Sequence, residues 1–91
     1  MNLTPFEIKV LRATPRFHNM TVPPSVIGQR VWGDKRKHGG YYSAQGLARM
    51  AGKFIHRLEK KKLIYWTVRR GYFYPVRSFK GNELLEELGK S

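Results

Sequence analysis

Polar and basic side chains recur at helical spacing between residues 43 and 60. At about 100° per residue, one face of a helix there carries Gln45, Arg49, Lys53, His56 and Lys60. No acidic residue falls on this face, since Glu59 lies on its flank. Arginine can bond guanine and glutamine can bond adenine through paired hydrogen bonds, whereas lysine more often meets phosphate. Such a face is typical of a helix that contacts nucleic acid, although a solvated basic face would show the same pattern.

The early residues of this helix are the candidates for reading bases. We expect Gln45 and Arg49 to reach base edges, because recognition helices commonly contact bases near their start. The cations farther along the helix are expected to meet phosphates: Lys53, Arg57 and Lys60. His56 completes the predicted set on this helix.

Two further basic segments could contact a polyanion. Arg69 and Arg70 precede Gly71 between two β-branched and aromatic runs, at residues 63–68 and 72–76, which predicts a tight hairpin. Arginines at such a tip would lie along a minor groove or the backbone, or would serve only to discourage edge pairing. A polar, glycine-rich stretch carries the other segment, Lys35, Arg36 and Lys37. We expect an exposed loop there that either clamps phosphate or only aids solubility.

Aromatic residues are interleaved with these cations. Tyr41 and Tyr42 precede the long helix, and Tyr72, Phe73 and Tyr74 line the hairpin. Such rings could stack on unpaired bases. In so small a domain, however, we expect most of them to pack in the core or across the strands. The two tryptophans, Trp32 and Trp66, are likewise expected to be packing residues.

The charge of the chain favours a polyanionic partner. Among 91 residues, 18 Lys and Arg stand against 6 Asp and Glu, a formal net charge of +12. Between Ile8 and Leu58 only Asp34 is acidic, whereas three glutamates crowd the C-terminus: Glu83, Glu86 and Glu87. A surface kept charged for solubility alone would be served as well by mixed signs. Attraction to a polyanion, through steering and counterion release, explains the segregation better.

Nothing in the sequence predicts an enzyme or a cofactor. There is no cysteine, so disulfides and thiolate zinc sites are excluded. The three histidines, His18, His38 and His56, are widely separated and have no carboxylate cluster near them, so we expect no metal site. No apolar run approaches the roughly 20 residues of a membrane span, and the N-terminus lacks a signal-peptide pattern. We expect a soluble, cytoplasmic protein with no membrane contact.

Local signals predict a first helix that starts at Pro5. Thr4 can cap it and Glu7 can complete a capping box. Pro15 lies just beyond its expected end. The residues expected to face inward are Phe6, Val10 and Leu11, with Lys9 and Arg12 outward.

Three more helices and the hairpin are expected to complete the domain. A second helix starts near Pro24 and closes at Gly33, with Gly28 as an unfavourable interior residue. Ser43 is the expected N-cap of the third and longest helix. The residues expected to face inward from this helix are Leu47, Met50, Ala51, Phe54 and Leu58, and from the hairpin Leu63 and Val68. A short last helix begins at Ser78 and packs through Leu84, Leu85 and Leu88.

Two segments resemble the winged helix-turn-helix superfamily. Phe54–Ile64 resembles the end of a recognition helix that leads into the first wing strand, in a pattern of leucine, glutamate, two basic residues, glycine and leucine. Ser78–Leu85 resembles the start of the C-terminal helix in MarR-like and PadR-like regulators, with Ser78 where threonine is usual. The resemblance implies an α+β winged helix over residues 1–91: three helices, a two-stranded wing and a short C-terminal helix. It places the third helix in the major groove and the wing against the backbone or minor groove.

This chain departs from the pattern at two places. Lys62 stands where the superfamily usually has glycine, which predicts a strained or differently shaped helix end. Residues 33–42 are also far longer than the turn of a tight helix-turn-helix. A ribosomal small-subunit family with a winged helix carries a similar basic insert near this point, so the loop does not separate DNA from RNA.

Three functions are therefore open from the sequence. The first is binding of double-stranded DNA by a regulator of transcription or of mobile-element functions, associated with the nucleoid. The second is a structural RNA-binding role on the ribosome, and the third is a protein–protein adaptor with an acidic partner. We expect a monomer, or a weak homodimer through the leucines of the last helix.

Overall fold

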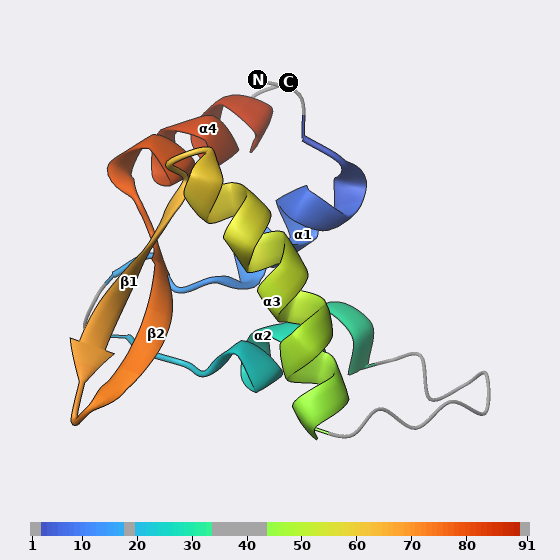
Figure 1. Cartoon of the computed structure of the whole chain (residues 1–91). Coiled ribbons are helices and arrows are strands. Elements are labelled where there is room, and N and C mark those ends of the chain that lie inside the picture. The colour runs from blue at the N-terminus through green and yellow to red at the C-terminus, as the bar shows by residue number, and fades with distance from the viewer. Residues whose placement is uncertain (1–2, 18–19, 34–43, 90–91) are drawn as a thin grey trace.

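Four helices and one antiparallel hairpin make up the described part of the chain, residues 3–17, 20–33 and 44–89, in a computed structural model (Figure 1). The elements in chain order are α1 (Pro5–Ala13), α2 (Pro24–Trp32), α3 (Ala44–Lys60), β1 (Ile64–Arg69), β2 (Tyr72–Arg77) and α4 (Phe79–Gly89). The α+β class and the element order agree with the prediction. The predicted basic loop with Lys35, Arg36 and Lys37, the cap Ser43, and Tyr41 and Tyr42 lie outside the described residues.

The start of α1 is held by the predicted capping box. The Glu7 backbone N–H donates to Thr4 Oγ1 at 3.2 Å, and the Thr4 N–H donates to Glu7 Oε1 at 3.1 Å. Two of the backbone donors left open at a helix start are thereby satisfied by local side chains. At the other end, the Thr14 hydroxyl donates to the Val10 carbonyl at 2.8 Å.

The core lies where α3 crosses α1 and α2 (Figure 1). From α3 the buried residues are Leu47, Ala51, Ile55 and Leu58, and from α1 and α2 they include Val10, Leu11, Ile27 and Trp32. The inward positions predicted for Leu47, Ala51 and Leu58 are confirmed. Met50 and Phe54 are only partly buried, because they lie beside the buried stripe and not within it.

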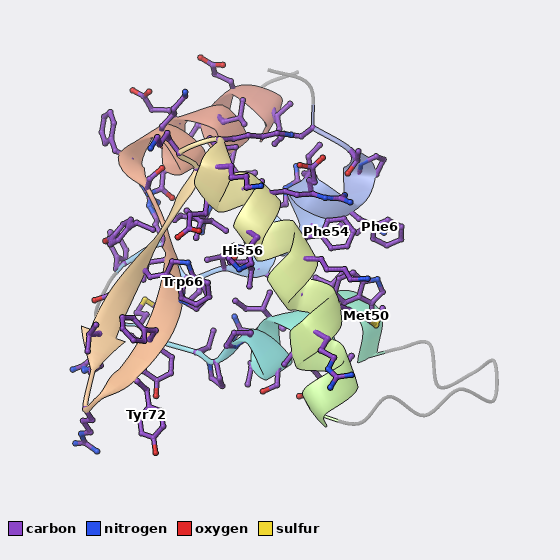
Figure 2. All side chains as sticks on the ribbon, viewed as in Figure 1. Phe6, Met50, Phe54, His56, Trp66 and Tyr72 are labelled. Carbon is purple, nitrogen blue, oxygen red and sulfur yellow. The ribbon has the colours of Figure 1, made fainter. Side chains whose placement is uncertain are left out.

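A cluster of three aromatic rings joins the helices at one edge of this core. The ring centroids of Phe6 and Trp32 are 6.0 Å apart, those of Phe6 and Phe54 6.2 Å, and those of Trp32 and Phe54 5.7 Å. Figure 2 shows Phe6 and Phe54 side by side. Phe6, predicted to face inward, remains 37% exposed because it closes the cluster from its outer side, whereas the packing role predicted for Trp32 is confirmed.

Helices α2 and α3 approach each other closely at Gly28. A Cβ atom on Gly28 would lie 2.5 Å from the Leu47 carbonyl oxygen. The glycine that is unfavourable for an isolated helix is therefore required by the crossing. Gly33 closes α2 as predicted, in the right-handed region at φ −59°.

A left-handed turn at Lys62 ends α3. The Lys62 backbone has φ 66°, the conformation that glycine adopts without cost. Its N–H donates to Glu59 O at 2.9 Å, and the Leu63 N–H donates to Leu58 O at 2.9 Å. These paired bonds are those of a Schellman motif, with Leu58 and Leu63 as its apolar contact. The strained helix end predicted for Lys62 is thus present, and the turn keeps the shape that glycine would give it.

The start of α4 is seated on this same turn. The Ser78 hydroxyl donates to Lys62 O at 2.7 Å and accepts from the Gly81 N–H at 3.0 Å, while the Ser78 N–H donates to Leu63 O at 2.9 Å. A Cβ on Gly81 would lie 2.3 Å from Leu63 O. The predicted cap at Ser78 is confirmed, and the serine-x-x-glycine pattern has a packing reason.

The hairpin is buried at its base and exposed at its tip. Ile64 and Val76 are 2% and 0% exposed, and Trp66 packs partly buried against the core as predicted. Arg70 and Gly71 have φ 53° and 82°, as a two-residue type I′ turn requires. The predicted tip is therefore confirmed.

Three predictions for the outer hairpin are wrong. Val68, expected to face inward, is 59% exposed, and Tyr72 and Phe73, expected to pack, are 68% and 66% exposed. The strands extend beyond the helices, so their outer residues meet no core (Figure 1). Tyr74, one position nearer the base than Phe73, is half-buried.

The close crossing at Gly28 yields a prediction with an internal control. We expect Gly28→Ala to lower the free energy of unfolding by about 1–3 kcal/mol, because the added methyl group meets backbone and not a flexible side chain. Gly52→Ala, in the middle of α3 with no atom near its added Cβ, should stabilise by about 0.5–1 kcal/mol. Urea unfolding measures both, and equal effects of the two substitutions would contradict the close crossing.

A second prediction concerns the left-handed turn. Lys62→Gly should raise the free energy of unfolding by about 1 kcal/mol, since glycine carries no Cβ penalty at positive φ. Lys60→Gly removes the same charge within α3 and should lower it by about 0.5–1 kcal/mol. Thermal unfolding compares them; a loss of stability in Lys62→Gly would show that the lysine side chain matters more than the turn.

Candidate nucleic-acid interface

One side of α3 is formed by exposed cationic side chains. The exposed residues are Arg49, Lys53, His56, Arg57 and Lys60. They lie opposite the buried stripe that packs against α1 and α2, so the predicted division of the helix into apolar and basic sides is confirmed. Gln45 belongs to the first turn of α3. The exposed side of α3 thus offers a row of donors that no other described element covers.

His56 differs from its neighbours in having an acidic partner. Its Nδ1 lies 3.5 Å from Glu59 Oε1, and its side chain is 71% exposed. Protonated His56 would therefore be partly balanced by Glu59. We rank it below Lys53 and Lys60 as a phosphate contact.

Arg57 is positioned by the aromatic cluster. Its guanidinium carbon lies 5.3 Å from the centre of the Phe54 ring. A guanidinium can stack on a ring and still donate in its own plane. On α1, Lys9 Nζ likewise lies 5.2 Å from the centre of the Phe6 ring. The aromatic cluster therefore carries a cation at each of two edges.

The cation next to this face, Lys61, is engaged in an internal ion pair. Lys61 Nζ donates to Glu7 Oε2 at 2.9 Å, and Glu7 is only 3% exposed. Burial raises the pKa of the Glu7 carboxyl, but the hydrogen bonds from Lys61 and Thr4 outweigh burial and leave that pKa below its usual value of 4.5. Lys61 therefore joins the end of α3 to the start of α1.

The hairpin tip forms a second basic point at the same end of the molecule as the start of α3. Arg69 and Arg70 are exposed, and both the tip and the first turn of α3 point away from α4 (Figure 1). The exposed glutamates lie on α4, at the opposite end: Glu83, Glu86 and Glu87. The exposed glutamates therefore lie away from the hairpin tip and from the first half of α3, whereas Lys60 and Lys80 are exposed at the α4 end.

Two features of the surface were not predicted from the sequence. The first is the exposure of Tyr72 and Phe73, which the sequence does not indicate because it does not show how far the strands extend past the core. The other feature is a groove of about 440 Å³ between α1 and α2. The residues that line it are Lys9, Arg12, Ala13, Arg30 and Val31. Arg30 Nη1 donates to Ala13 O at 3.1 Å there, a tertiary contact that has no sequence signature.

The ion pair of Glu7 predicts a pH dependence of stability. Because the folded pKa of Glu7 is lowered, its contribution is complete above the unfolded value near 4.5 and is lost as pH falls through the folded value. We expect Glu7→Gln to cost about 1–3 kcal/mol at pH 7 and to flatten the acid limb of the stability curve. Urea unfolding between pH 7 and pH 3 measures this.

Glu86→Gln is the matched control for Glu7→Gln. Glu86 pairs with Arg16 at 3.8 Å, and both side chains are more than half exposed. Such pairs contribute little, so the change should stay within about 0.5 kcal/mol. An equal response of the two variants to pH would contradict the role given to the buried pair.

Within the described residues, no three His, Asp or Glu side chains come together as metal ligands would. None of the helices in residues 3–17, 20–33 and 44–89 has the length and apolar character needed to cross a bilayer. Comparisons of the chain with protein-family models, with curated proteins and with solved structures found no match.

Proposed function

We propose that this chain is a winged-helix protein that binds double-stranded DNA and regulates transcription or a mobile-element function. The element order supports this: α1, α2 and α3 are followed by the β1–β2 hairpin and α4. In this proposal α3 is the recognition helix and the hairpin is the wing. Such a protein would act in the cytoplasm at the nucleoid, as a monomer or weak homodimer.

The observation that carries the proposal is the separation of charge across the fold. Exposed cations line α3 and the hairpin tip, while the exposed glutamates of α4 lie at the far end. A polyanion placed against the basic end meets attraction from Arg49, Lys53 and Arg70, which lie on elements away from the exposed glutamates of α4. The same placement would bring the first half of α3, from which Arg49 is exposed, to the groove, and base reading by Gln45 and Arg49 is part of the proposal.

Duplex DNA fits this surface better than duplex RNA does. The major groove of B-form DNA, roughly 12 Å wide, admits an α-helix. The major groove of an A-form RNA helix is too narrow for its bases to be read there. The exposed length of α3 therefore favours DNA. Structured RNA remains the second candidate, because the exposed rings of Tyr72 and Phe73 are suited to unpaired bases.

A pair of lysine substitutions tests the proposal. Lys53 and Lys80 are both exposed, but Lys53 lies on α3 and Lys80 on α4. We expect Lys53→Ala to weaken binding to a duplex of about 20 base pairs severalfold and to reduce the slope of log affinity against log salt by about 0.9. Lys80→Ala should change neither. Fluorescence anisotropy over a salt series measures both quantities.

Two results would overturn this assignment. Equal losses in Lys53→Ala and Lys80→Ala would mean that net charge alone, and not the side of α3, drives binding. Displacement of the labelled duplex by equal amounts of structured RNA, with no reverse displacement, would make RNA the partner.

A further inference from the structure

The outer half of the hairpin presents large apolar side chains to solvent. Val68, Tyr72 and Phe73 are 59%, 68% and 66% exposed, whereas Val76 at the base is fully buried. We call residues 68–73 the hairpin tip. Exposed apolar groups that cluster in one place commonly mark a binding surface. Packing within the fold therefore does not explain why these apolar side chains are at the hairpin tip.

The two rings lie on opposite faces of the hairpin tip. Successive residues of a strand point to opposite faces, so Tyr72 and Phe73 cannot share one. The strand register pairs Tyr72 with Arg69 and Phe73 with Val68. One face thus carries a ring beside an arginine, and the other carries a ring beside a valine. Figure 2 shows Tyr72 at the free end of the hairpin.

The charge of the hairpin indicates what chemistry would cover these rings. No acidic residue occurs between Glu59 and Glu83, so the whole hairpin and its flanks are neutral or basic. Arg69 and Arg70 end the tip, and Arg70 keeps a left-handed conformation at φ 53°, where asparagine, aspartate or glycine is preferred. The charges of Arg69 and Arg70, with no acidic residue in the hairpin to balance them, favour an anionic ligand next to the rings.

We propose that the hairpin tip binds DNA at sites where base stacking is interrupted, such as a bulge, a mismatch or a fork. Tyr72 and Phe73 would each stack on one exposed base, and Arg69 and Arg70 would contact the flanking phosphates. This inference rests on the proposed DNA binding and specifies the form of DNA that is preferred.

The placement of the rings favours interrupted duplexes over the other forms of DNA. An intact duplex offers no free base planes, and opening one costs stacking energy that an existing bulge has already lost. Proteins that track a single strand stack successive bases along one groove. A ribbon with one ring on each face instead fits a gap between two bases, with one base against each ring.

The test compares three labelled DNAs of equal length with the whole chain: an intact duplex, the same duplex with a central bulge, and the single strand. We expect the bulged duplex to bind about tenfold more tightly than the intact one. The double variant Tyr72→Ile, Phe73→Ile should lose this preference, while its affinity for the intact duplex changes by less than about twofold. Isoleucine keeps strand propensity, and both positions are exposed, so the fold should be retained.

A ring elsewhere on the hairpin supplies the matched control. Tyr65 lies near the base and is 43% exposed, and Tyr65→Ile should keep the preference for the bulge. A fluorescent adenine analogue placed in the bulge provides a second measurement, its emission intensity, which contacts between charges alone would not change. Its emission should be quenched by the wild-type chain through stacking on a ring, and not by the double variant.

The following outcomes would each overturn the inference. Equal affinity for the intact and bulged duplexes, or a preference retained by the double variant, would remove the rings from recognition. Tighter binding to the single strand, or to a bulged RNA of the same sequence, would assign the tip to another ligand. A wild-type dimer that the double variant converts to a monomer would make the tip a self-association surface. Failure of the proposed function itself looks different, since none of the three DNAs would then bind.

Discussion

The left-handed turn at Lys62 sets the positions of the elements in the C-terminal half of the fold. Three elements meet there, because α3 ends at this turn, β1 leaves from it and α4 is seated on it. Its carbonyl groups are engaged on both sides, Lys62 O by the Ser78 hydroxyl and Leu63 O by the Ser78 N–H. A change in this turn would therefore alter the direction of the hairpin relative to α3 and the position of α4 together. The junction links the basic helix to the basic tip, and two bonds from Arg77 to Thr14 O and Pro15 O also hold the base of the hairpin.

Charged side chains are used differently at the two ends of the molecule. At the end with α4, the ion pair of Lys61 with Glu7 uses one cation for stability within the core. At the other end, cations stay exposed and Arg70 holds an unfavourable backbone conformation. Interactions that stabilise the fold are thus concentrated near the junction. The hairpin tip combines a residue at positive φ, Arg70, with the exposed side chains of Val68, Tyr72 and Phe73.

Local chemistry explains why much of this fold follows from the sequence. The capping box of Thr4 and Glu7 depends only on neighbours, and the two sides of α3 follow from helical periodicity. The cap at Ser78 could also be predicted from the sequence. Why glycine follows it at position 81 could not, because the approach of Gly81 to the Leu63 carbonyl appears only in the tertiary structure. The partnership of Glu7 with Lys61 was not predictable, because the residues are separated by 54 positions. Alternation along the strands indicated which residues share a face, but not how far the hairpin extends past the core, and so Val68, Tyr72 and Phe73 were misplaced.

The near isolation of the hairpin tip from the core also has an evolutionary consequence. Substitutions at Val68, Tyr72 or Phe73 disturb few buried contacts, whereas a side chain at Gly28 or Gly81 would collide with backbone. Mutations at the tip can accumulate without loss of the fold, so selection can alter what the tip recognises while the junction stays unchanged. Relatives of this chain should then vary most at residues 68–73 and least at Gly28, where α2 crosses α3, and at Gly81, where α4 meets the Leu63 carbonyl.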